Sequence, residues 1–116
     1  MAGNPDLLRA TLETIILQCI AGGATYGYEI AKAIEKRSEG ELLAQEGTLY
    51  PALHRLEKKA FLRANWRLSP EGRKRKHYRL TAAGNRHLAS LRDQWQSFSE
   101  TVNRMLGIAH ARIVTA

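Results

Sequence analysis

Residues 47–80 read GTLYPALHRLEKKAFLRANWRLSPEGRKRKHYRL, and the spacing of the apolar residues changes once within this stretch. In the first part they recur three and four positions apart, which is the spacing of one face of an α-helix: Leu49, Ala52, Leu53, Leu56 and Ala60. From Leu62 onward they alternate with polar residues in two short runs, as in β-strands. Ser69-Pro70-Glu71-Gly72 separates those runs with turn residues. The stretch therefore predicts a helix, capped by Gly47 and Thr48, followed by a β-hairpin.

Two further helices are predicted before residue 47. Pro5 and Asp6 are typical of a first helical turn, and the apolar spacing that follows continues until Gly22-Gly23. A second helix begins near Tyr26, and Gly40 is expected to end it. Short amphipathic helices of this kind need one another to form a core.

A long last helix is predicted over residues 82–106, with Thr81 as its N-cap. Its apolar residues are spaced alternately three and four apart, as in a coiled coil: Leu88, Leu91, Trp95, Phe98, Val102 and Met105. At 1.5 Å per residue the helix would be about 37 Å long, too long to bury this seam against three short helices. We expect the same helix of a second copy to cover it, which makes the protein a homodimer.

The positive charge of the chain is concentrated in one segment. The sequence has 18 Lys and Arg against 11 Asp and Glu, a formal net charge of +7. Residues 54–80 alone contain ten Lys or Arg against Glu57 and Glu71, so the remainder is close to neutral. Such a segment favours a polyanionic partner, most often nucleic acid, because neutralised phosphates release their counterions.

The predicted order of elements is that of a winged helix-turn-helix, a fold that is mainly α with a small β-hairpin. We expect a DNA-binding domain over residues 1–81 and a C-terminal dimerisation helix over residues 82–116, forming one compact unit. In such a domain the third helix enters the major groove of DNA. A dimer would then place two of these helices in successive grooves, so the operator is expected to be an inverted repeat in double-stranded DNA.

The outward side of the third helix is expected to contact the DNA through Thr48, Tyr50, His54, Arg55 and Lys58. Arg55 is the first candidate for base readout because an arginine bonds guanine bidentately, whereas His54 and Lys58 are expected on phosphates. Tyr26, at the start of the second helix, is expected to offer its hydroxyl to a phosphate.

The hairpin is expected to be the wing, with its cations on the DNA backbone or in the minor groove. These cations are consecutive and are expected at the tip: Arg73, Lys74, Arg75 and Lys76. Four adjacent positive charges repel one another, which favours an anionic partner over a merely solvated turn.

Trp95 and Phe98 allow two interpretations. At heptad positions they are expected in the dimer core, together with Leu88, Leu91 and Val102. Aromatic residues beside a two-fold axis can instead line a flat pocket for a small aromatic ligand, which would be an effector.

Enzymes, metal sites and membrane proteins find no support in the sequence. The four histidines lack metal-ligand spacing, and the single cysteine, Cys19, excludes an internal disulfide and any CxxC motif. No apolar run is long enough to span a bilayer, and the N-terminal residues lack a signal pattern. We therefore expect a non-enzymatic, cytoplasmic protein without cofactor or metal.

Three runs resemble the PadR family of bacterial transcriptional regulators: YGYEI from Tyr26, GTLYPALHRLE from Gly47, and RKRKHYRLT from Arg73, with Gly84. The resemblance implies a homodimeric winged helix-turn-helix repressor that binds palindromic operators and is often released by a small aromatic molecule. It also implies that Tyr26, Thr48, Tyr50, His54 and the wing cations contact DNA. Ala60 departs from the pattern, because the family usually has glycine there. If the position needs a positive φ, alanine adds about 1 kcal/mol of strain.

Two alternatives remain at this point. The first is a winged-helix protein-interaction module, whose basic segment meets an acidic protein surface without specific DNA binding. The second is a repressor with no small-molecule effector, in which Trp95 is only dimer core.

Overall fold

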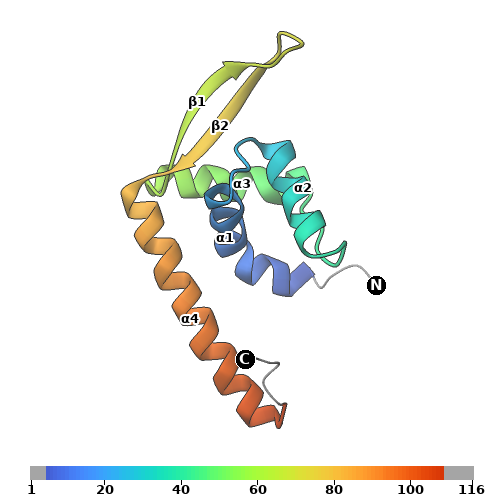
Figure 1. Ribbon diagram of the computed structural model, residues 1–116, viewed down its shortest axis with the longest axis vertical. Helices are drawn as coiled ribbons and strands as arrows, with labels where there is room; N and C mark the ends of the chain where they lie inside the picture. Colours follow the sequence, from blue (N-terminus) through green and yellow to red (C-terminus); the bar gives the residue numbers. More distant parts are fainter. Residues whose placement is uncertain (1–4, 109–116) are drawn as a thin grey trace.

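The computed structural model describes residues 5–108, with side chains from Thr11 onward. Its elements are α1 (Pro5–Ala21), α2 (Gly27–Arg37), α3 (Glu46–Lys58), β1 (Leu62–Leu68), β2 (Lys74–Leu80) and α4 (Ala82–Leu106). The first three helices form one body, from which the hairpin projects on one side and α4 on the other (Figure 1). The predicted order and the winged helix-turn-helix fold are confirmed. Residues 109–116 of the expected C-terminal segment lie outside the described residues.

The core lies between the three helices and the root of the hairpin. Its most deeply buried large side chains come from α1, α2 and α3: Ile16, Leu17, Ile30, Leu49, Leu53 and Leu56. Full burial of an aliphatic side chain of this size contributes about 1.5–3 kcal/mol to folding. The predicted apolar face of α3 is therefore confirmed from Leu49 to Leu56, and the remaining sides of this helix are largely exposed.

The predicted start of α3 is wrong by a few residues. The helix begins at Glu46 after Gln45, and no side chain caps it. Thr48 lies inside the first turn, where its backbone N–H donates to the Gln45 carbonyl at 3.0 Å. Local cap preferences were overridden here by the packing of the apolar face, which fixes the helix from Leu49 onward.

The hairpin is packed only at its root. Its strands are antiparallel, with Leu62 opposite Leu80, and Leu62 and Tyr78 are buried. Trp66 and Leu68 continue the apolar alternation of β1, yet they are 63% and 71% exposed. The alternation therefore correctly predicts which residues share a face of the strand, but it does not predict that they are buried. The outer half of the hairpin, from Trp66 onward, projects beyond the helical body.

The end of α3, the root of the hairpin and the start of α4 meet at one junction. Thr81 caps α4 as predicted: its Oγ1 accepts from the Gly84 N–H at 2.9 Å and donates to the Ala60 carbonyl at 2.7 Å. A Cβ on Gly84 would collide with the Phe61 carbonyl oxygen, so glycine is required for this close approach. Ala60 itself has a φ of 66°. The position therefore does need a positive φ, and the alanine there is strained.

Only the first part of α4 packs on the body. Leu88 is buried in the core of its own protomer, and Leu91 is half-buried against that core. Trp95 and Phe98 are 53% and 63% exposed. The prediction that one chain cannot bury the whole seam is confirmed, but Leu88, which was expected in that seam, belongs to the protomer's core.

Candidate nucleic-acid interface

The side of α3 opposite the core carries three polar side chains at helical spacing. Tyr50, His54 and Lys58 follow one another at intervals of four residues and are exposed. Within the described part of the chain, the side chains of His54 and Lys58 make no hydrogen bond or ion pair. We call these three residues the α3 stripe. The side chains of His54 and Lys58 thus remain available to an incoming ligand.

Tyr50 is held in place by a glycine of α2. Its ring lies against Gly27, where an added Cβ would meet the ring carbon Cε1 at 2.8 Å and would collide with the hydroxyl. Gly27 is buried at the first position of α2, directly after Tyr26. The glycine of the YGYEI run therefore lets α2 and α3 approach closely enough to fix the direction of Tyr50.

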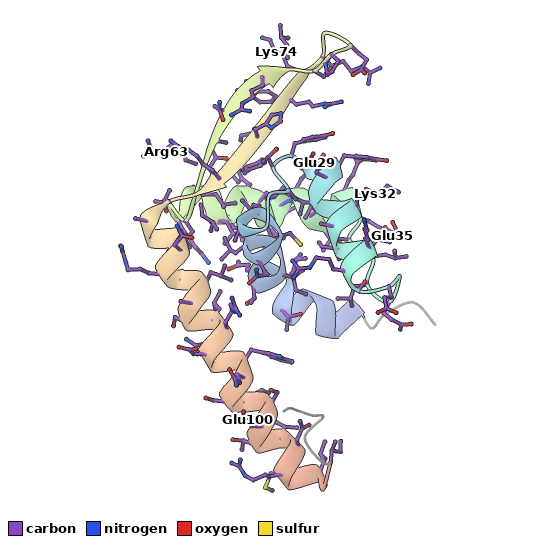
Figure 2. The ribbon with its side chains drawn as sticks, in the orientation of Figure 1. Glu29, Lys32, Glu35, Arg63, Lys74 and Glu100 are labelled. Carbon is purple, nitrogen blue, oxygen red and sulfur yellow. The ribbon has the colours of Figure 1, made fainter. Side chains whose placement is uncertain are left out.

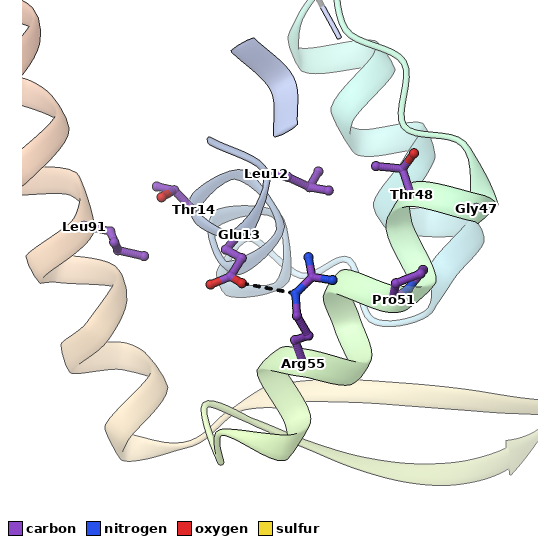
Figure 3. A pocket seen from close by; sticks show the side chains of 8 residues that line it. All are labelled: Leu12, Glu13, Thr14, Gly47, Thr48, Pro51, Arg55 and Leu91. Atoms are coloured by element: carbon purple, nitrogen blue, oxygen red, sulfur yellow. Dashed lines mark ion pairs between the residues drawn. The ribbon is translucent and has the colours of Figure 1, made fainter. Parts of the chain in front are cut away.

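Arg55 does not share the side of the α3 stripe. Its Nε lies 3.7 Å from Oε2 of Glu13 on α1, and Lys59 Nζ lies 3.7 Å from the same atom. Figure 3 shows Arg55 reaching toward Glu13 across a pocket that Thr48 also lines. The arginine side chain is 55% exposed, so this pair orients it with less than about 1 kcal/mol. Arg55 and Thr48 thus lie on a flank of α3 that faces α1, and the expectation that Arg55 leads base readout stays a prediction.

The cluster of cations expected at the hairpin tip is divided. Arg73 lies in the turn and Lys74 begins β2; both are exposed, and neither side chain has a partner among the described residues. Lys76 Nζ instead donates to Oε1 of Glu57 on α3 at 2.8 Å, and this hydrogen bond raises the pKa of Lys76. Arg75 is half-buried, and its guanidinium nitrogen Nη2 lies 3.5 Å from Oε1 of Glu71. Two of the four expected wing cations thus pair with carboxylates of the same chain, and the expected contact of all four with DNA stays a prediction.

Tyr26 connects the start of α2 with the wing. It forms an antiparallel bridge with His77, and the two rings are 5.2 Å apart between centroids. The guanidinium of Arg75 lies 4.4 Å from the centroid of the Tyr26 ring, a cation–π contact. The Thr25 carbonyl also accepts from the Tyr78 N–H at 2.8 Å. These contacts fix Tyr26, which is half-buried, in relation to β2 of the wing.

Besides Arg75, the strands of the hairpin hold three arginines that were not predicted to belong to a site: Arg63, Arg67 and Arg79. The register places Arg63 opposite Arg79 and Arg67 opposite Arg75. Because side chains alternate between the two sides of a strand, these four share one side of the hairpin. We call them the arginine face. Alternation with Ala64 and Trp66 was the signal that would have found them, once the register was known.

A comparison with protein families identifies this winged helix. The family model described as "Transcriptional regulator PadR-like family" matches residues 16–90, from within α1 to within α4. The chain belongs to the PadR-like family. The resemblance of its three sequence runs to PadR regulators is thereby confirmed, and the match includes the α3 stripe and the whole wing.

Individual relatives agree with this assignment. Uncharacterized protein X of Lysinibacillus sphaericus is 37% identical over 98 residues, covering 84% of this chain and 90% of the relative. A solved transcriptional regulator from Clostridium thermocellum superposes with a TM-score of 0.78 at 30% identity, covering 85% of this chain and 96% of the other. A PadR-like transcriptional regulator from Bacillus cereus gives a TM-score of 0.74 at 33% identity, covering 87% and 96%. This PadR-like chain is therefore a transcriptional regulator and not an enzyme.

In residues 5–108, His, Cys, Asp and Glu nowhere gather in a group of three or more that could hold a metal ion. Within the same range, none of the helices has the length and apolar character needed to cross a membrane. Cys19 is buried on α1, and burial raises the pKa of its thiol, which keeps it protonated and unreactive.

Proposed function

We propose that this PadR-like regulator is a sequence-specific DNA-binding repressor that acts as a homodimer. The observation that carries the proposal is the α3 stripe, which lies on an exposed side of α3 and in which the side chains of His54 and Lys58 have no partner among the described residues. Free cations on Arg73 and Lys74 of the neighbouring wing support the same partner. A helix with donors on its free side, beside a basic hairpin, suits the major groove and the adjacent backbone of duplex DNA.

The members of the stripe have different parts in this proposal. His54 and Tyr50 can donate to or accept from base edges, and they supply the sequence preference. Lys58 is a point charge at the end of the stripe and binds phosphate. Tyr26, which the wing holds beside α2, adds a hydroxyl for the backbone. Arg55 reaches a base only after it leaves Glu13, so we assign it a secondary part.

A second copy of the chain covers the exposed part of α4 in the proposed homodimer. Trp95 and Phe98 lie on one side of the helix with Val102, and all three follow the half-buried Leu91. Large aromatic side chains are seldom left exposed in a row on a soluble protein. Two-fold symmetry then sets the two α3 helices about 34 Å apart, so the operator is an inverted repeat.

Release by a small aromatic ligand is the third part of the proposal. Its support is a pocket between α1 and α4, lined by Thr14 of α1 and by Arg92, Asp93, Trp95 and Gln96 of α4. Trp66→Phe leaves Trp95 as the single tryptophan, so its fluorescence can be titrated with candidate aromatics. Saturable quenching together with loss of DNA binding is expected. Quenching without loss of DNA binding, or no saturable quenching, would favour a repressor with no effector.

DNA binding is tested by selecting bound genomic fragments and then titrating the selected duplex against a random one. We expect at least about a thousandfold preference for the selected duplex. His54→Ala should weaken the selected duplex by about 1–3 kcal/mol and alter base preference. Lys58→Ala should weaken all duplexes and reduce the salt slope by about one.

Lys36→Ala serves as the matched control for Lys58→Ala. Lys36 is an exposed lysine in the last turn of α2, the end remote from the wing (Figure 1). Its removal should leave both affinities unchanged. Equal affinity of the unmodified protein for selected and random duplexes would instead favour the protein-interaction module.

A further inference from the structure

Glu29, in the first turn of α2, is connected to the wing through the side chain of Thr25. Its carboxylate oxygen Oε1 accepts from the Thr25 N–H at 2.9 Å and lies 3.2 Å from the Thr25 hydroxyl oxygen Oγ1. The same Oγ1 lies 2.8 Å from Nδ1 of His77 on β2. Figure 2 shows Glu29 at the end of α2 that is nearer the hairpin. Three polar side chains thus form one row from α2 to the wing.

The hydroxyl of Thr25 has a single proton and lies between two possible acceptors. It can donate either to the Glu29 carboxylate or to an unprotonated Nδ1 of His77. When the imidazole of His77 is positively charged, both ring nitrogens carry a proton, so Nδ1 donates to Thr25 Oγ1. The hydroxyl then donates to Glu29, and all three side chains are joined. When Nδ1 has no proton, the hydroxyl donates to the ring, and Glu29 keeps the bond from the Thr25 N–H.

The charges around His77 give Glu29 a particular part in this row. His77 lies on the same side of the hairpin as the four guanidinium groups of the arginine face, which are its neighbours along and across the strands. The Tyr26 ring lies 5.2 Å from the His77 ring between centroids, on the side of α2. Glu71 is paired with Arg75 near the tip. Among the described residues, Glu29 is therefore the carboxylate placed to offset a positive charge on His77.

The row adds side-chain bonds to a backbone link between the wing and the start of α2. The Tyr78 N–H donates to the Thr25 carbonyl at 2.8 Å, and Tyr26 and His77 form an isolated antiparallel bridge. The Tyr78 amide therefore reports how firmly the wing is held against α2. Hydrogen bonds with a charged partner are stronger than neutral ones, so a protonated His77 should make this hold firmer.

We propose that Glu29 is a positioning residue for the wing, which it holds through Thr25 and the protonated ring of His77. The hold is complete at mildly acidic pH and weakens as pH rises through the range in which histidines lose their proton. Its effect on DNA rests on the proposed function: a wing that is already fixed loses less conformational freedom when DNA binds. Operator affinity then depends on Glu29 without a contact between Glu29 and DNA.

Hydrogen exchange of the Tyr78 amide tests the hold in the protein without DNA. From about pH 8 to about pH 6 its protection factor, which is corrected for the exchange rate of an unstructured amide, should rise about fivefold. Thr25→Val keeps the shape without the hydroxyl and should lose this rise, whereas Thr25→Ser should keep it. Glu29→Gln should also lose it, although its amide oxygen can still accept from the Thr25 N–H. The Thr81 amide, which donates to the Phe61 carbonyl at 3.1 Å, is the control and should respond alike in all four proteins.

The effect on DNA is measured by titrating the selected operator with the same proteins. Thr25→Val changes no charge, so its salt slope should stay unchanged. Its affinity should fall about fivefold at about pH 6 and by less at about pH 8, because the charged row is lost. Thr25→Ser should bind as the unmodified protein does.

Equal pH dependence of Tyr78 protection in the unmodified protein, Thr25→Val and Glu29→Gln would overturn the inference. A parallel change at the Thr81 amide would also overturn it, because the whole fold would then have loosened. An unaltered operator affinity of Thr25→Val at both pH values would overturn the part that concerns DNA. If Tyr78 protection behaves as expected but no protein prefers the selected duplex, the hold on the wing stands and the proposed function fails instead.

Discussion

The helices α3 and α4 share one pattern of apolar residues but differ in what covers it. The apolar side of α3 is buried from Leu49 to Leu56 within a single chain. The corresponding side of α4 is buried only at Leu88 and then becomes exposed at Trp95 and Phe98. The pattern thus indicates that a helix has an apolar face, whereas the tertiary contacts of the chain decide how much of that face is buried.

The largest effect is expected from shortening a side chain on α3. Leu53 is fully buried, so Leu53→Ala should lower the free energy of unfolding by about 2–5 kcal/mol through lost burial and a new cavity. Phe98→Ala, the equivalent truncation on α4, should change the unfolding of the monomer by less than about 1 kcal/mol because its ring is already exposed. Denaturant titration at low protein concentration measures both. Equal losses would show that the α4 seam packs inside its own protomer.

A charge in the α4 seam should separate the proposed dimer. Trp95→Glu would bury an unpaired carboxylate at the interface, so the dimer dissociation constant should rise by at least about a hundredfold. Sedimentation velocity over a range of concentrations measures the change. Ser97→Glu puts the same charge at an exposed residue about half a helical turn away and should leave the dimer intact. A dimer that persists in Trp95→Glu would place the interface elsewhere.

Both helices end in the same backbone motif with different residues. After α3, the Phe61 N–H donates to the Leu56 carbonyl at 3.0 Å, and after α4 the Ile108 N–H donates to the Asn103 carbonyl at 2.9 Å. The left-handed residue is Ala60 in the first motif, with φ 66°, and Gly107 in the second, with φ 73°. Ala60→Gly should therefore stabilise the protein by about 1 kcal/mol, and Gly107→Ala should destabilise it by a similar amount. Thermal unfolding measures both, and changes of the same sign would contradict this explanation.

The smallest effect concerns the hydrogen bond between α3 and the wing, which has no counterpart on α4. Glu57→Gln should cost less than about 1 kcal/mol, because Glu57 and Lys76 are partly exposed. Since folding raises the pKa of Lys76, this contribution is full below the unfolded lysine pKa of about 10.4 and is lost as pH rises through the folded value. The stability difference between the two proteins should therefore stay constant from neutral to mildly alkaline pH and then vanish. A difference that grows with pH would contradict the pairing.

Local features were predictable from the sequence, and features that depend on distant contacts were not. Residues close together in the sequence determine the order of elements, the Thr81 cap and the buried side of α3. Each of these follows from the spacing of apolar residues or from cap chemistry. The direction of Arg55 depends on Glu13, which is 42 positions away in another helix. The arginine face depends on the strand register, and the exposure of Trp66 depends on where the body ends. The residues proposed to contact DNA remain predictions from both sources.

The junction of Thr81 and Gly84 with Ala60 and Phe61 gives α4 the mechanics of a lever. The root of the wing and the root of the helix share this fulcrum, and a rigid rod of 25 residues extends about 37 Å from it. A shift of about 2 Å at the far end of α4 therefore corresponds to a rotation of only about 3° at the fulcrum. Movement at the far end of α4 is therefore transmitted to the root of the wing as a small rotation about this junction.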